Sequence, residues 1–326
     1  MGPQPKILVI GSPEGLADES LWKSFQSQYR VRMYDFPTLD GFHTSLRNGE
    51  CSDIVGIVRL GLNIPQGIEK VGQGWTQRGL PYFPDSLRLI VNFGHGYDEE
   101  DIQGLQKKGI QFFNTPGGDE ATAAVGIYLV ISVFRQLGRY EKMLRQGDFL
   151  PALRDSAKTA VDTLGRHIGI VGMGAIGKAV ARHAAGLGMY IHSLDRPNLR
   201  AALSLQGDDA ASLSLPPITL AQSLDELVGK VDCVVLACSY TPQTHHLLSK
   251  EVFARMKHGM RIVNIARGKC IDEDALCGAL ATGQVAAAGL DVHYNESVTL
   301  PSHAEQERLP RALPLVSFPP FYPFSN

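Results

Sequence analysis

Residues 168–177 read Ile-Gly-Ile-Val-Gly-Met-Gly-Ala-Ile-Gly, an apolar run that leads into a Gly-x-Gly-x-x-Gly loop. The pattern predicts a strand, a glycine-rich turn and the start of a helix. In such a loop Gly172 permits the tight turn, Gly174 lets the backbone approach a pyrophosphate, and Gly177 lets the helix pack on the strand. Because N–H groups and the helix dipole favour an anion at that end, the stretch predicts a dinucleotide-binding Rossmann domain.

An acidic residue stands where such a domain binds the ribose. Asp195 ends the next predicted strand, about twenty residues beyond the loop. Its carboxylate can accept hydrogen bonds from ribose hydroxyls and would repel a 2′-phosphate, so we expect NAD to be preferred to NADP. Arg196 follows directly and could soften that repulsion. Ala175 and Ile176, inside the loop, are assigned to the same cofactor site.

Size and composition restrict the possible classes of protein. A chain of 326 residues predicts two domains. Hydrophobic residues make up 44% and charged residues 20%, an ordinary balance for a globular protein. The net charge of -2 argues against nucleic acid and against electrostatic recruitment to a membrane. Since no apolar stretch reaches about 18 residues, we expect no membrane span.

The cysteines and histidines suggest neither disulfides nor a metal. The chain has five cysteines and no Cys-x-x-Cys pair, which favours reduced thiols in the cytoplasm. The apolar run at residues 7–10 is too short for a signal peptide and is expected to be a strand. His245 and His246 are adjacent, but no further ligands follow at metal-site spacing, so we interpret them as surface residues.

Short apolar runs alternate with helical patterns in two series, which predicts an α/β fold with parallel sheets. In the first series we expect strands at residues 6–10, 31–34, 54–58, 87–91 and 110–113, and helices at 16–29 and 98–108. In the second we expect strands at 168–171, 189–194, 231–237, 261–265, 286–290 and 314–318, and helices at 175–187, 223–228, 250–256 and 272–282.

Three further stretches have their own patterns. Residues 61–84 are rich in Gly and Pro and are expected to form a loop. Residues 198–217 are interpreted as a surface insertion. Residues 121–137 are predicted to form a long apolar helix that packs between two domains.

Five segments together resemble the D-isomer-specific 2-hydroxyacid dehydrogenase family, in particular its glyoxylate/hydroxypyruvate reductase-like members. They are residues 92–98 (NFGHGYD), 109–116 (GIQFFNTP), 172–177 (GMGAIG), 263–268 (VNIARG), and 289–292 (GLDV) followed by Glu296. The resemblance implies two doubly wound parallel-sheet domains, with the Rossmann NAD-binding domain (119–300) inserted after a flavodoxin-like substrate domain (1–118). Residues 301–326 would form a truncated C-terminal return segment.

The resemblance also implies roles for individual residues. Arg267 and Glu296 would be catalytic, Arg267 by gripping the carboxylate and keto oxygen of a 2-oxo acid through its planar guanidinium. Backbone N–H groups of Gly94, His95 and Gly96 would hold the same carboxylate. Further cofactor contacts would come from the following residues: Cys238, Ser239, Thr244, Ile265, Ala266, Arg267 and Asp291.

The chain departs from the family at the general acid. The family has a Pro-His step after the last cofactor-domain strand, and its histidine pairs with the catalytic glutamate. Here Pro320 stands in that position, and the chain stops at Asn326. Three explanations remain open: a truncated or mis-spliced C-terminus, a substitute acid such as His95 or His293, and a protein that binds NAD and an acid without turnover.

Two functions therefore follow from the sequence. The first is hydride transfer between NAD(H) and a 2-oxo acid/D-2-hydroxy acid pair, impaired by loss of the histidine; loss of a general acid typically costs about 10²–10⁴-fold in rate. The alternative is a catalytically inactive NAD-binding regulatory or interaction protein. In both cases the expected partners are a small 2-oxo acid and a second copy of the chain, since the family commonly forms dimers.

Overall fold

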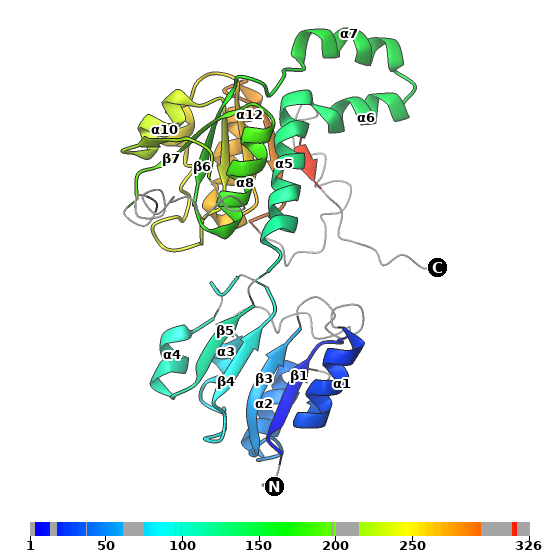
Figure 1. Ribbon diagram of the computed structural model, residues 1–326, viewed down its shortest axis with the longest axis vertical. Coiled ribbons are helices and arrows are strands. Elements are labelled where there is room, and N and C mark those ends of the chain that lie inside the picture. Colours follow the sequence, from blue (N-terminus) through cyan, green and yellow to red (C-terminus); the bar gives the residue numbers. More distant parts are fainter. Residues whose placement is uncertain are drawn as a thin grey trace. The chain divides into compact units, whose positions relative to one another are not determined.

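The structure, a computed structural model, divides into two compact units, residues 1–118 and 119–326, which are described separately (Figure 1). It describes residues 4–13, 18–36, 38–60, 75–94, 96–98, 100–115, 117–196, 199, 215–294 and 315–317. Each unit contains one sheet whose paired strands all run parallel. The predicted α/β class with two parallel-sheet domains is therefore confirmed.

The first unit has a five-stranded sheet in the order β2-β1-β3-β4-β5. This is the flavodoxin-like order, in which the chain reverses direction across the sheet beside the first strand. The strands are β1 (Lys6–Ile10), β2 (Arg30–Met33), β3 (Ile54–Arg59), β4 (Leu89–Asn92) and β5 (Gln111–Asn114). The helices are α1 (Glu19–Gln28), α2 (Leu39–Arg47), α3 (Trp75–Gly79) and α4 (Ile102–Lys107).

Apolar strands form the core of this unit. Leu8, Val9 and Ile10 of β1 are fully buried, as expected for a parallel strand covered on both faces. Phe42 of α2 is also fully buried, and its ring lies 5.2 Å from that of Tyr34. This packing explains why α2 forms, and Thr38 caps the helix by accepting a hydrogen bond from the Gly41 N–H.

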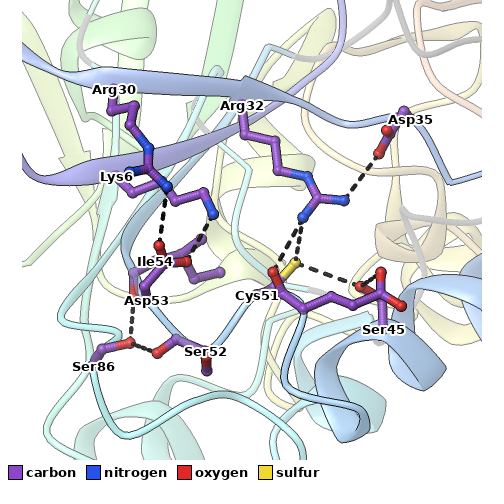
Figure 2. Close-up of polar contacts among 11 residues, drawn as sticks. Lys6, Arg30, Arg32, Asp35, Ser45, Cys51, Ser52, Asp53, Ile54 and Ser86 are labelled. Atoms are coloured by element: carbon purple, nitrogen blue, oxygen red, sulfur yellow. Dashed lines mark hydrogen bonds and ion pairs between the residues drawn. The ribbon is translucent and has the colours of Figure 1, made fainter.

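Charged side chains fasten the amino ends of the same strands (Figure 2). Lys6 begins β1 and Arg30 begins β2, and both pair with Asp53, which directly precedes β3, at 2.8 and 3.2 Å. The Ser86 hydroxyl lies 2.7 Å from the carbonyl oxygens of both Ser52 and Ile54. Ligands of open α/β sheets bind at the opposite, carboxyl edge, so we interpret this cluster as structural.

The second unit has a seven-stranded sheet in the order β12-β11-β10-β9-β6-β7-β8. Counted from β6, the first six strands have the Rossmann order 3-2-1-4-5-6, and β12 adds a seventh. The strands are β6 (His167–Val171), β7 (Tyr190–Leu194), β8 (Ile218–Ala221), β9 (Cys233–Leu236), β10 (Met260–Asn264), β11 (Val285–Leu290) and β12 (Leu315–Ser317). Strand β12 comes from the predicted return segment 301–326 and pairs with β11.

Helices cover both faces of this sheet, and each face has its own apolar core. The helices are α5 (Asp119–Arg135), α6 (Leu137–Arg145), α7 (Phe149–Thr159), α8 (Ala175–Gly186), α10 (Leu224–Lys230), α11 (Lys250–Arg255) and α12 (Glu273–Ala281), with a short 3₁₀ helix η1 (Gly268–Cys270). The apolar residues of α5 pack on α8, β10 and β11 inside this unit. The sequence had instead suggested a helix between domains.

Within the described residues no single helix is long and apolar enough to cross a membrane. Helices α5 and α6 would pass that test only as a pair, and they are bent by 68° at their junction. Leu129, Val130 and Phe134 of α5 are fully buried in the core of their own unit.

Several elements were not expected from the sequence. Helix α3 lies inside the stretch 61–84 that was predicted to be a loop, and β8 directly follows the predicted insertion. Helices α6 and α7 pack on each other and form an arm that protrudes from the second unit (Figure 1). The arm carries five exposed apolar side chains: Leu137, Leu144, Phe149, Leu150 and Leu153.

Candidate functional site

The glycine loop joins β6 to α8, and it can adopt its shape only because two of its residues have no side chain. Gly172 has φ +102°, and a Cβ there would lie 2.5 Å from the Cys238 nitrogen. A Cβ on Gly177 would overlap the carbonyl oxygen of Gly172, so the helix could not pack this closely on the turn. Both positions therefore require glycine.

The third glycine of the loop faces open space. Gly174 is the N-cap of α8, no side chain caps this helix, and a Cβ at Gly174 would meet no described atom within 4 Å. Ala175 and Ile176 follow as the first two residues of the helix. An exposed helix N-terminus with a bare backbone in front of it fits a pyrophosphate, so these residues fit the dinucleotide that the sequence predicts.

Asp195 follows the end of β7, on the same edge of the sheet as the glycine loop. Its N–H donates to the Ala221 carbonyl at 2.8 Å, and its carboxylate accepts from Gln222 Nε2 at 3.1 Å. The Arg196 guanidinium lies 3.4 Å from the Asp195 carbonyl oxygen. The carboxylate is thus held at the position where the sequence predicts ribose binding.

The loop after β9 contains Cys238, Ser239 and Thr244. The Thr244 hydroxyl donates to the Ser239 carbonyl at 2.9 Å and accepts from the Thr241 N–H at 2.7 Å, which closes the loop. A hydrogen bond to the Cys270 thiol, together with burial, raises the pKa of Cys238. Cys238 therefore stays protonated, and its N–H borders Gly172.

Arg267 lies three residues beyond the end of β10. The Asn264 side chain spans the turn between them: Oδ1 accepts from the Ala266 N–H at 3.0 Å and Nδ2 donates to the Arg267 carbonyl at 3.0 Å. The Arg267 guanidinium donates from Nη1 to the Ala266 carbonyl at 2.7 Å. Ile265 and Ala266 are buried in the two apolar cores, so their contact with a cofactor could involve only main-chain atoms.

The segment after β11 lies against the Arg267 turn. The Asp291 N–H donates to the Asn264 carbonyl at 3.0 Å, and a Cβ on Gly268 would overlap the main chain of His293. Although the Asp291 side chain is exposed, partial desolvation raises its pKa. Glu296, the predicted catalytic carboxylate, and Pro320 lie outside the described residues.

The predicted substrate loop belongs to the first unit and follows β4. Asn92 Nδ2 donates to the Gly96 carbonyl at 3.2 Å, and the Gly94 N–H donates to Thr115 Oγ1 at 3.0 Å. In the absence of a ligand the Gly94 N–H thus has a partner within its own unit, and its use in holding a carboxylate stays a prediction. The Gly96 N–H remains a candidate, and His95 lies outside the described residues.

A buried ion pair lies at the same edge of the first sheet. Arg59 ends β3, in register with Asn92 of β4, and its Nη1 donates to Glu100 Oε1 at 2.8 Å. Their side chains are 14% and 3% exposed. Sequence reasoning missed these residues and the roles of Asn92, Thr115 and Asn264; the only available signal was an asparagine at a strand end just before a predicted site residue.

The adjacent histidines are only partly the surface residues that were predicted. His245 is exposed, whereas His246 is half-buried with φ +47°, and their rings stack at 4.0 Å. In the part of the chain that the structure describes, no three His, Cys, Asp or Glu side chains are grouped to hold a metal.

The second unit therefore gathers most of the predicted residues at one edge of its sheet. The glycine loop, Asp195, Cys238, Arg267 and Asp291 follow the carboxyl ends of β6, β7, β9, β10 and β11, which are parallel. Open α/β sheets bind their ligands at that edge. The substrate loop occupies the corresponding edge of the other unit.

Comparison with known proteins agrees with this arrangement. Residues 127–321 match the family model described as D-isomer specific 2-hydroxyacid dehydrogenase, NAD binding domain. The chain is 33% identical over 295 residues to 4-methyl-2-oxopentanoate reductase A of Aspergillus oryzae, covering 90% of this chain and 83% of that protein. It is 35% identical over 216 residues to the glyoxylate reductase of Korarchaeum cryptofilum, covering 65% of this chain and 61% of that protein.

A solved structure is similar over nearly the whole chain. The holo form of Rhodotorula graminis D-mandelate dehydrogenase has a TM-score of 0.83 and 34% identity, covering 96% of this chain and 87% of that one.

Proposed function

Because the chain belongs to the D-isomer specific 2-hydroxyacid dehydrogenase family, we propose that it transfers hydride between NAD(H) and a 2-oxo acid/D-2-hydroxy acid pair. The observation that carries the proposal is that the glycine-lined N-terminus of α8 and the Arg267 turn lie at the same edge of the second sheet. The second unit is then the NAD-binding domain and the first the substrate domain.

The residues divide the work between binding and orientation. Bound NADH would supply the hydride. Gly174 and the N-terminus of α8 would bind the pyrophosphate. Asp195 would accept hydrogen bonds from the ribose hydroxyls and repel a 2′-phosphate. Arg267 would hold the carboxylate and keto oxygen of the substrate. In the first unit the N–H groups of Gly94, His95 and Gly96 would hold the same carboxylate.

The general acid is the open point. Glu296 would be the catalytic carboxylate, but Pro320 stands where the family has its histidine. His293 is a candidate replacement because its main chain adjoins Gly268, directly after Arg267, and it lies two residues beyond Asp291. The same departure favours the second candidate function, a catalytically inactive NAD-binding regulatory or interaction protein.

One assay separates the two functions. NADH oxidation is followed with glyoxylate, hydroxypyruvate, 4-methyl-2-oxopentanoate and phenylglyoxylate, while calorimetry measures NADH binding. For an enzyme we expect turnover with at least one acid and an Arg267→Ala variant that is about 10³-fold slower, with a much smaller change in NADH affinity. Arg255→Ala, which removes a surface arginine of α11 in the same unit, is the matched control. NADH binding without turnover would favour the inactive protein, and absence of NADH binding would contradict both.

The arm formed by α6 and α7 supports a homodimer. Phe149, Leu150 and Leu153 of α7 are 60%, 59% and 55% exposed, and apolar groups clustered in this way are typical of interaction surfaces. The expected occupant is the same arm of a second copy, since the family commonly pairs through its cofactor domains. Phe149→Asp with Leu153→Asp should shift the sedimentation coefficient to that of a monomer, whereas Leu21→Asp on α1, equally exposed in the first unit, should not.

We also propose a cytoplasmic location. All five cysteines are free thiols, which supports a reducing compartment. Localisation of the full-length tagged protein in cells is the direct test, and an oxidising compartment would contradict the proposal.

A further inference from the structure

Asn264 is bonded at both polar ends of its side chain and is almost wholly buried, with 1% of its surface exposed. Its Oδ1 accepts from the N–H two residues ahead, in Ala266, and its Nδ2 donates to the carbonyl three residues ahead, in Arg267. An asparagine that bonds its own following backbone in this way stabilises a turn where the strand ladder ends. The turn that presents Arg267 is therefore shaped by one side chain.

The backbone of Arg267 is constrained from two further directions. Its carbonyl also accepts from the Cys270 N–H at 3.1 Å, in the 3₁₀ helix η1. Gly268 is in such close contact with the main chain of His293 that it has no space for a Cβ. Two donors hold the Arg267 carbonyl, and Gly268 is packed tightly against the main chain of His293. The main chain of Arg267 can therefore move only if the Asn264 hydrogen bond breaks or η1 shifts.

We propose that Asn264 is a positioning residue that aims the Arg267 guanidinium at the substrate carboxylate. This role rests on the proposed function of Arg267. The Nδ2 donor is the group to test because it holds the Arg267 carbonyl directly, whereas Oδ1 acts through Ala266, whose carbonyl accepts from Arg267 Nη1. A misplacement of about 1 Å at such a group can cost about 10²-fold in rate.

The donor can be removed without changing the shape of the residue. In Asn264→Asp the acceptor for Ala266 remains, but a carboxylate oxygen faces the Arg267 carbonyl and repels it. When the new carboxyl is protonated, its O–H can donate again. Burial raises the pKa of a carboxyl, so the variant should recover as the pH falls. The main chains of Arg267 and Asp291 both contact Asn264, and the positive charge of Arg267 opposes the rise in pKa that burial causes.

The experiment measures the affinity of oxamate, an unreactive 2-oxo acid analogue, for the NADH complex by calorimetry at pH 8 and pH 5.5. Relative to wild type, Asn264→Asp should bind oxamate at least tenfold more weakly at pH 8 and within about threefold at pH 5.5, while NADH affinity stays within threefold. Asn264→Ala should be weak at both pH values. In an Arg267→Ala background, Asn264→Asp should add less than twofold, because residues that act through one another are not additive.

Three results would overturn the role of Asn264: wild-type oxamate affinity in Asn264→Asp at pH 8, an undiminished effect in the Arg267→Ala background, or an equal loss of NADH affinity. If Asn264→Asp binds no NADH, Asn264→Ser tests the same donor, since its hydroxyl can still accept from Ala266 but is too short to reach Arg267. A wild-type protein that binds NADH but neither binds oxamate nor reduces any 2-oxo acid would instead contradict the proposed function, and this role with it.

Discussion

In each unit a loop with predicted site residues follows a strand that ends in an asparagine: the Arg267 turn after β10 and residues 94–96 after β4. The asparagine is hydrogen-bonded to its loop in a different way in the two units. In the second unit both groups of the Asn264 side chain are satisfied within the turn itself. In the first unit Asn92 donates to Gly96, but its buried Oδ1 has no partner among the residues that the structure describes. The second fastening comes from Thr115, which follows the neighbouring strand β5 and accepts from the Gly94 N–H.

The difference concerns how far each loop depends on the rest of its unit. The Arg267 turn is held by hydrogen bonds within the turn itself, together with contacts from η1 and from the segment after β11. The substrate loop depends on the correct pairing of β4 with β5, and on Arg59 and Glu100 beside it. A buried carbonyl oxygen without a partner carries a free-energy cost, so the described contacts determine the first loop less completely than the Arg267 turn.

The largest expected effect comes from breaking the ion pair beside the substrate loop. Glu100→Gln leaves the buried Arg59 charge without its counterion and should lower the free energy of unfolding of the first unit by about 3 kcal/mol. Both tryptophans, Trp22 and Trp75, lie in that unit, so urea unfolding followed by tryptophan fluorescence reports on it.

The matched control is Asp53→Asn at the opposite edge. The Asp53 carboxylate pairs with two cations, Lys6 and Arg30, but it is 53% exposed. The loss in the free energy of unfolding should therefore be at most about 1 kcal/mol. Equal losses from the two variants would remove the distinction between the loop-bearing edge and the amino edge.

A smaller effect should follow from Thr115→Val, which keeps the side-chain volume and removes the acceptor of the Gly94 N–H. We expect about 1 kcal/mol of lost stability and a three- to tenfold rise in the KM for the 2-oxo acid, with an unchanged KM for NADH. Thr44→Val on α2, whose hydroxyl accepts only from surface Arg47, should change neither value. A Thr115→Val protein with wild-type kinetics and stability would indicate that Asn92 fastens the loop alone.

The smallest effect concerns pH at the amino edge of the second sheet, away from both loops. Burial lowers the pKa of His192 below its ordinary value of 6.5, and its Nε2 lies 2.7 Å from His167 Nδ1. The unfolded chain then takes up the proton more readily than the folded one. Stability present above about pH 6.5 should therefore be lost as the pH falls through the folded pKa.

Urea unfolding monitored by circular dichroism between pH 7.5 and 5 checks this expectation. The decrease should be smaller in His192→Gln and unchanged in His258→Gln, whose imidazole is exposed. Neither variant should change the affinity for oxamate, because the amino edge lies at the opposite end of the strands from the Arg267 turn. A coupled change would mean that the two edges of the second sheet are not independent.

The sequence predicted every strand of the two sheets except β8, because buried strands depend on local patterns. Buried parallel strands are recognisable as apolar runs. The 172–177 loop is recognisable because Gly172 and Gly177 are each required, for a different steric reason, at a fixed spacing. The engagement of the Gly94 N–H was not predictable, since Thr115 meets it only through the pairing of β4 with β5. Helix α2 was not predicted although it has a local signal, the N-cap at Thr38. The arm of α6 and α7 was not predicted because most of its apolar side chains are exposed and do not form a buried core.

The steric requirement at Gly172 and Gly177 also bears on redesign of the coenzyme preference. Any side chain at either position collides with main-chain atoms that cannot retreat, so the turn itself offers no freedom for engineering. The end of β7 is different, since Asp195 and Gln222 contact each other there through their side chains. Libraries that aim at phosphorylated coenzymes should therefore vary residues 195, 196 and 222 and leave the turn untouched.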